Sequence, residues 1–95
     1  MEIEIVRMNR FDSMGNTKAF CDISLDGKVV IKGFKVILSS RDNELFVGLP
    51  SEKGKDGNYY NTFVPMNEDF SYKLKKTILD YYNKGDSYDV TKRKE

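Results

Sequence analysis

Polar and apolar residues alternate along the first part of the chain, a pattern typical of strands that bury one face. Residues 2–8 (EIEIVRM) place Ile3 and Ile5 on the same side. Residues 17–25 (TKAFCDISL) alternate in the same way, and Cys21 belongs to their apolar row. We therefore expect two strands that share an apolar core, with Cys21 buried as a small hydrophobic residue.

Glycines mark the turns and the irregular point of this region. A turn around Gly15, within DSMGN, would join the first two strands. Asp26 and Gly27 both tolerate a positive φ, so they predict a two-residue hairpin turn. Residues 28–38 (KVVIKGFKVIL) follow as a third strand, but its apolar residues change from odd to even positions at Gly33. A bulge or bend at Gly33 would bring both halves onto one face.

Two further apolar segments surround a polar loop. Residues 44–50 (ELFVGLP) and 58–65 (NYYNTFVP) predict strands four and five. The loop between them, residues 51–58, is rich in Lys, Gly, Glu and Asp. Tyr59 and Tyr60 would point to opposite sides of the fifth strand, so we expect one in the core and the other in solvent.

After the fifth strand the apolar period changes to three and four residues, which predicts an amphipathic helix. Four residues would form its buried side: Phe70, Leu74, Ile78 and Tyr81. Three residues could cap its first turn: Asn67, Asp69 and Ser71. Gly85 is suited to end it. Residues 85–95 show no clear period and predict a flexible tail.

This order of elements predicts an α+β fold, a five-stranded antiparallel sheet followed by one C-terminal helix that covers one face. Residues 1–84 would form a single domain and residues 85–95 the tail. A chain of 95 residues buries only a thin core, and the edges of such a sheet can pair with another chain. Both features favour a homodimer.

Composition excludes several classes of site. The chain has one cysteine and no histidine, so neither a disulfide within the chain nor a Cys/His zinc site can form. A serine or cysteine nucleophile activated by histidine is excluded as well, and no spacing of carboxylates indicates a magnesium site. We expect no enzymatic activity, no metal and no cofactor. Since no segment has the pattern of a signal peptide or a membrane span, we expect a cytoplasmic protein without a membrane partner.

The formal net charge is +1, so a polyanion would have to be recognised by local groups of lysines. Lys53 and Lys55 lie in the polar loop, which is either an ordinary solvated connection or a flexible basic finger that contacts phosphates. The first turns of the helix contain Lys73, Lys75 and Lys76. They form either a solvated helix face or a basic surface for a sugar–phosphate backbone.

Other charged residues bear on these alternatives. Asp80 follows Lys76 by four residues and could simply pair with it. Further cations lie on the first and third strands: Arg7, Arg10, Lys28, Lys32 and Lys35. On an open face of the sheet they would extend a positive field. Three acids are their alternative partners: Glu2, Glu4 and Asp22.

Several stretches of the sequence resemble the stage V sporulation protein G (SpoVG) family, small bacterial septation and sporulation regulators. The opening MEIEIVRMNR and the later ISLDGKVVIKGFKVI are similar to the family's start and second hairpin. The most specific stretch is LFVGLPS, followed by DG and PMN, because Pro50-Ser51, Asp56-Gly57 and Pro65 occur in the family's order and spacing. The resemblance extends from Met1 to about Tyr82.

The resemblance implies a homodimeric sheet-plus-helix protein that binds DNA and, in some members, RNA. It also implies nucleic-acid contacts after Pro-Ser and on the basic helix, at Lys53, Lys55, Lys73, Lys75 and Lys76. We therefore predict a non-enzymatic regulator that acts through lysine–phosphate contacts. The alternative is a protein-interaction module in septation or sporulation control that does not bind nucleic acid directly. Binding through phosphates should weaken steeply with salt, whereas an apolar interface should not.

Overall fold

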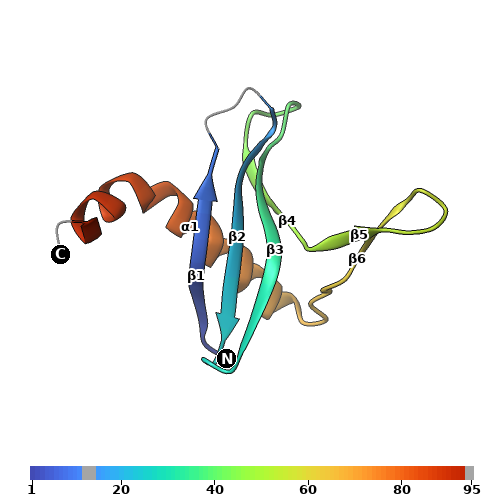
Figure 1. Cartoon of the computed structure of the whole chain (residues 1–95), viewed down its shortest axis with the longest axis horizontal. Helices are drawn as coiled ribbons and strands as arrows, with labels where there is room; N and C mark the ends of the chain where they lie inside the picture. Colours follow the sequence, from blue (N-terminus) through green and yellow to red (C-terminus); the bar gives the residue numbers. More distant parts are fainter. Residues whose placement is uncertain (12–14, 94–95) are drawn as a thin grey trace.

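The computed structural model contains a four-stranded antiparallel sheet, a helix behind it and a two-stranded arm beside it (Figure 1). It describes residues 1–11 and 15–93, with side chains up to residue 84. The sheet consists, in spatial order, of β1 (Ile3–Arg10), β2 (Thr17–Leu25), β3 (Val29–Leu38) and β4 (Leu45–Gly48). The arm pairs β5 (Ser51–Lys53) with β6 (Tyr59–Asn61), and α1 spans Glu68–Arg93. The predicted α+β class is confirmed.

The predicted fifth strand does not join the sheet, so the expectation of five strands is wrong. The chain leaves the sheet at Pro50, which has no N–H to donate to a ladder and is buried over Gly33. The N–H of Thr62 donates to the carbonyl oxygen of Pro50 at 2.8 Å and closes the base of the arm. Residues 50–62, here called the arm, therefore form a separate hairpin that projects from the sheet (Figure 1).

The bulge predicted at Gly33 is confirmed. The register between β2 and β3 shifts so that Asp22 lies opposite both Lys32 and Gly33. Gly33 has a φ of 102°, a conformation that favours glycine. The extra residue brings Phe34 onto the same face as the apolar residues before the bulge. A second bulge, at Val6 of β1, has no equivalent in the sequence prediction.

The turns follow local backbone preferences. Asp26 and Gly27 have φ values of 54° and 66°, which confirms the predicted two-residue hairpin. The carboxylate of Asp26 also accepts a hydrogen bond from the N–H of Glu2 at 2.6 Å. The turn therefore ties the start of the chain to the sheet. Of the first predicted turn, residues 12–14 lie outside the described residues.

One face of the sheet and one side of α1 form the core. Its fully buried side chains come from β2, β3 and the helix: Ala19, Cys21, Ile23, Phe34, Val36, Leu74 and Ile78. Cys21 is only 1% exposed, which confirms that it is buried. Burial, with a smaller effect of the Asp22 carboxylate, raises the pKa of Cys21 to about 12. The thiol therefore stays protonated at neutral pH, which disfavours nucleophilic chemistry.

The helix begins as predicted but continues further. Asn67 is its cap, because the side-chain oxygen accepts the N–H of Phe70 at 2.8 Å. The predicted end at Gly85 is wrong, since α1 continues to Arg93. A single glycine within a helix costs only about 1 kcal/mol relative to alanine, and no proline follows it. The flexibility of residues 85–95 stays a prediction, as does the domain boundary at residue 84.

Candidate nucleic-acid interface

The tip of the arm, residues 54–58 between β5 and β6, is ordered by the carboxylate of Asp56. It accepts hydrogen bonds from the N–H of Asn58 at 3.0 Å and from the hydroxyl of Tyr60. These bonds, that of Tyr60 foremost, lower the pKa of Asp56 below its usual value. Gly54 leaves room for the Tyr60 ring, because a Cβ there would lie 2.8 Å from Cε2. Both the glycine and the acid of the tip therefore have a role in the hairpin itself.

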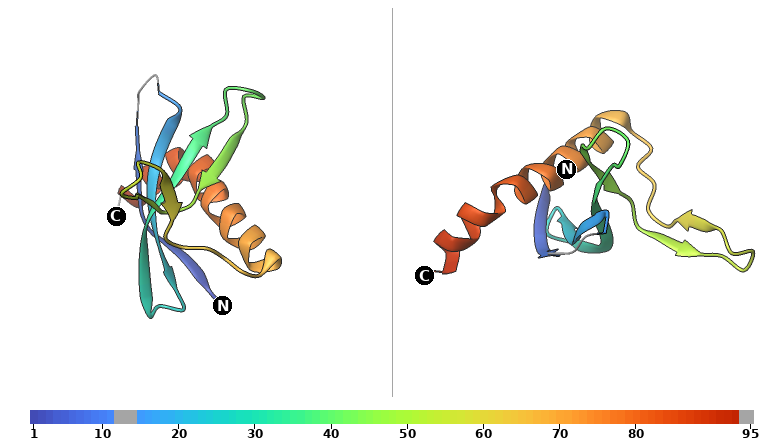
Figure 2. Two further views of the ribbon diagram at one scale, coloured as in Figure 1. Left: turned by 90° about the vertical axis from the view of Figure 1, so that its right-hand side faces the viewer. Right: turned by 90° about the horizontal axis from the view of Figure 1, so that it is seen from above.

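The two lysines of the arm are presented to solvent. Lys53 ends β5 opposite Tyr59, and Lys55 lies in the tip. Both are exposed, and neither ammonium group forms a hydrogen bond or ion pair with another described residue. Tyr59 is 70% exposed and Tyr60 is 52% exposed, so the expectation that one of them enters the core is wrong. The arm projects away from the sheet, which leaves both of its faces uncovered (Figure 2).

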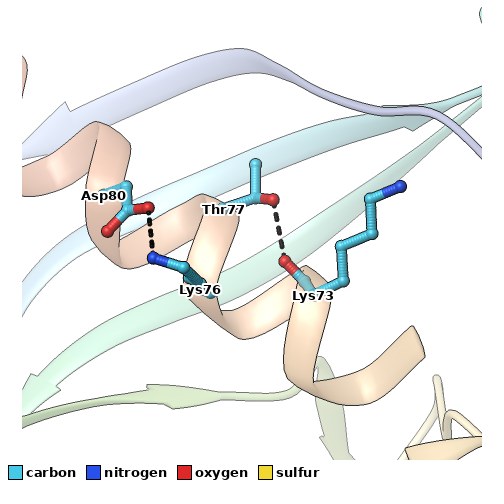
Figure 3. Close-up of polar contacts among 4 residues, drawn as sticks. All are labelled: Lys73, Lys76, Thr77 and Asp80. Atoms are coloured by element: carbon cyan, nitrogen blue, oxygen red, sulfur yellow. Dashed lines mark hydrogen bonds and ion pairs between the residues drawn. The ribbon is translucent and has the colours of Figure 1, made fainter. Parts of the chain in front are cut away.

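The lysines of the helix form more contacts within the chain than the lysines of the arm do. The ammonium of Lys76 forms an ion pair with Asp80 at 3.1 Å, and this hydrogen-bonded carboxylate raises the pKa of Lys76 (Figure 3). The side chain of Lys73 extends away from that pair and donates to the carbonyl oxygen of Met1 at 3.2 Å. Lys75 is half-buried. The pairing between Lys76 and Asp80 is the alternative that the four-residue spacing indicated.

The structure does not bring the five predicted lysines together. Helix α1 packs on one face of the sheet, against β1, β3 and β4. The arm projects sideways past the β4 edge of the sheet, as the view from above shows (Figure 2), and its base borders the sheet face opposite α1. A single chain therefore presents two separate lysine groups, Lys53 with Lys55 on the arm and Lys73, Lys75 and Lys76 on the helix.

The face of the sheet opposite α1, here called the open face, contains a groove of about 400 Å³. Its floor includes Arg7, Phe20, Lys32 and Lys35, and the base of the arm forms its wall. The sequence predicts a positive field from these cations only if one face of the sheet is open. What the sequence did not reveal is the aromatic ring of Phe20 among these cations, because its exposure depends on how the arm is placed.

Arg10, which the sequence groups with Arg7, lies on the helix side instead. Its guanidinium lies 5.8 Å from the ring centroid of Tyr81 and 5.6 Å from that of Tyr82. It also donates a hydrogen bond to the carbonyl oxygen of Tyr81 at 3.3 Å. Arg10 therefore attaches the helix to β1 through cation–π contacts rather than contributing to the open face.

The described part of the chain lacks the features of two other classes of site. There, no group of carboxylates and cysteine is arranged to hold a metal ion. In the same part of the chain, no helix is long and apolar enough to cross a membrane.

Comparison with known proteins identifies the family to which this sequence belongs. The family model SpoVG matches residues 1–84. The chain belongs to the SpoVG family. The resemblance inferred from the proline, glycine and strand motifs is thereby confirmed, and the SpoVG match includes the whole arm and the lysine-bearing turns of α1.

Relatives named "Putative septation protein SpoVG" match over most of their length. The protein from Acetivibrio thermocellus is 38% identical over 82 residues, which are 86% of this chain and 85% of the relative. The protein from Clostridium perfringens is 32% identical over 90 residues, covering 95% and 98% of the two chains. The "SpoVG 2" protein of Listeria monocytogenes is 32% identical over 84 residues, covering 88% and 80%. These SpoVG names refer to septation and not to a catalysed reaction.

Proposed function

We propose that this SpoVG family member is a non-enzymatic, cytoplasmic regulator that binds DNA, RNA or both as a homodimer through lysine–phosphate contacts. The observation that supports this most directly is the arm. Lys53 and Lys55 lie on a projecting hairpin with no partner among the described side chains. Exposed ammonium groups on such a projection are suited to phosphates, whose contacts position a protein without reading sequence.

Salt dependence tests this function. Ten lysines are available in a dimer, and if about half of them contact phosphates, log K should fall against log salt with a slope of about −4 to −5. Fluorescence anisotropy of labelled DNA fragments and matching transcripts, measured between 50 and 200 mM salt, gives the slope. The absence of binding at low salt, or binding that is independent of salt, would contradict the proposal.

The homodimer is supported by apolar surface that one chain leaves exposed. An isolated two-stranded hairpin is marginally stable in water, yet the arm presents Tyr59 and Tyr60 without a covering layer. The connection from the arm to α1 also exposes Val64 at 62% and Met66 at 98%. Docking of the arm on a second copy would cover part of this surface. It would also double the lysine contacts through two-fold symmetry.

We expect sedimentation equilibrium at micromolar concentration to give twice the chain mass of 11.0 kDa. Tyr59→Ser should weaken the dimer about tenfold or more, because tyrosines at interfaces are frequent binding hot spots and each dimer loses two. Tyr72→Ser is a matched control, since Tyr72 is 69% exposed on the helix and Tyr59 is 70% exposed. A monomeric parent protein would refute the dimer. An equal effect of both variants would show that the arm is not the contact.

A second candidate function rests on a specific surface. An apolar groove of about 610 Å³ lies where the arm returns to the helix. Its apolar lining includes Met1, Leu25, Phe63, Met66 and Phe70. Such a surface suits a protein partner, as required for an interaction module in septation or sporulation control. Binding of this kind should change little with salt, which separates it from phosphate recognition.

A further inference from the structure

Phe20 occupies an unusual position for an aromatic residue in the interior of a sheet. It lies in β2, between β1 and β3, and is nevertheless 44% exposed on the open face. Its neighbours Ala19 and Cys21, on the other face, are buried. The ring makes an edge-to-face contact with Phe11, with centroids 4.8 Å apart and planes at 89°. Phe20 is therefore supported from one side and still accessible.

Cations surround this ring. Lys35 lies directly opposite Phe20 on β3, and Arg7 and Lys32 line the same groove. None of these three cations forms an ion pair with another described side chain. Phe20 thus lies in a groove that combines an accessible aromatic ring with available positive charge.

We propose that the open-face groove binds single-stranded nucleic acid, with an unpaired base stacked on Phe20 and the adjoining phosphates contacted by Arg7, Lys32 and Lys35. This deepens the proposed function and rests on it. Bases in a duplex have their faces stacked inside the helix, whereas an unpaired base can stack on an aromatic side chain. The volume of about 400 Å³ lies within the usual range of ligand sites.

The remaining charges of the groove orient the strand. Asp22 and Glu52 also line it, and their carboxylates repel phosphates. They can accept hydrogen bonds from amino groups on base edges, as acidic side chains do from cytosine. Asp22 lies opposite Arg7 on β1 and Lys32 on β3, so we place the edge of the stacked base toward Asp22, between these two cations.

The groove also leads to the arm. Pro50, Ser51 and Glu52 form part of its wall, and the same strand continues outward to Lys53. A single strand in the groove can therefore continue along the arm toward Lys53, because the base of the arm borders the groove. The helix lysines lie behind the sheet and are separate from this path.

Tryptophan fluorescence tests the stacking directly, because the chain contains no tryptophan. Phe20→Trp should show saturable quenching by a thymidine oligonucleotide and by the uridine equivalent, and little quenching by a blunt duplex. Phe46→Trp is the matched control. Phe46 is 46% exposed on the same face, but it lies outside the groove, in a depression lined by Arg41, Asp42 and Glu44. Its emission should change little.

Affinities complete the test. Phe20→Ala should weaken single-strand binding about five- to a hundredfold, the usual effect of removing one stacked base contact. Duplex binding should change less than twofold, and the salt slope should stay the same because the cations remain. Circular dichroism monitors folding, and Phe46→Ala should bind like the parent protein.

Three outcomes overturn the inference in different ways. If the parent protein binds no nucleic acid at any salt concentration, the proposed function fails and the groove proposal fails with it. If the parent binds while Phe20→Ala binds equally well and Phe20→Trp is not quenched, only the stacking fails. If Phe20→Ala turns a dimer into a monomer, the open face is a contact between subunits and not a nucleic-acid site.

Discussion

Replacing both Lys53 and Lys55 with alanine is expected to weaken nucleic-acid binding strongly on every sequence. If the electrostatic contribution vanishes near 1 M salt, each phosphate contact contributes roughly fivefold at 0.15 M. The loss in a dimer is then about thirtyfold if two of the four arm lysines make contact and approaches a thousandfold if all four do. The salt slope should become shallower by about 1.8 to 3.6. Anisotropy titrations at several salt concentrations measure both quantities.

The helix variant with Lys75→Ala and Lys76→Ala should have a smaller effect. Lys76 already pairs with Asp80 at 3.1 Å, and Lys75 is half-buried, so these two lysines are less available to phosphate and their removal costs fewer contacts. The fold should persist, because alanine is a better helix former than lysine and exposed ion pairs contribute little to stability. The structure therefore predicts an order between two lysine groups that the sequence does not distinguish.

A control with the same change in charge separates local contacts from the global field. Lys28→Ala with Lys84→Ala changes the net charge from +1 to −1, as the arm variant does, but removes exposed lysines outside both groups. We expect it to bind within a fewfold of the parent protein. If the arm variant, the helix variant and this control all lose the same affinity, the positions of the lysines are irrelevant. If the arm and helix variants both bind like the parent, the assignment of the site to these five lysines fails.

Local chemistry explains why much of the sheet was predictable. The parity change at Gly33 could be recognised because a strand that buries one face must keep its apolar residues in step, and only an inserted residue restores the step. Asp26-Gly27 was equally clear, since few residue pairs tolerate two successive positive φ values. The cap at Asn67 follows from the same kind of local rule. Each of these features depends on residues adjacent in the chain.

The arm was not predictable for the opposite reason. Residues 58–65 have the composition of a strand whether they join the main sheet or pair only with β5. What decides between the two is the contact of Pro50 with Gly33, two residues 17 positions apart in the sequence. The pattern of apolar residues within either segment does not predict that contact. The exposure of Tyr59 and Tyr60 is a consequence of the same long-range choice.

The candidate site also combines local features that the sequence predicts with a long-range arrangement that it does not. Lys32 and Lys35 are three positions apart, so in a regular strand they would point to opposite faces. The bulge between them brings both to the open-face groove. The sequence analysis identified the bulge and the cations separately, but their combination requires the register of β2 against β3. Phe20 can be recognised as a candidate site residue only when the structure shows that this face is uncovered.

Phe34→Ala is expected to destabilise the protein more than any surface change. Phe34 is fully buried beside the bulge and packs edge-to-face on Phe63, with ring centroids 5.5 Å apart. Truncating a buried phenylalanine costs about 3–5 kcal/mol, from lost burial and the cavity that remains. Small domains have unfolding free energies of about 5–15 kcal/mol, so this is a large share of the total. Chemical denaturation followed by circular dichroism measures the difference, at a fixed protein concentration because a dimer unfolds in a concentration-dependent manner.

Phe46→Ala provides the comparison within the same sheet. Phe46 is 46% exposed on β4 and faces away from the core, so we expect its loss to cost less than about 1 kcal/mol. Equal losses for the two variants would mean that the open face is covered in solution and that Phe46 is buried by it. A loss below about 1.5 kcal/mol for Phe34→Ala would mean that the core closes over the cavity. Phe63 lies in the segment between the arm and α1, so its ring contact with Phe34 also attaches this segment to the sheet.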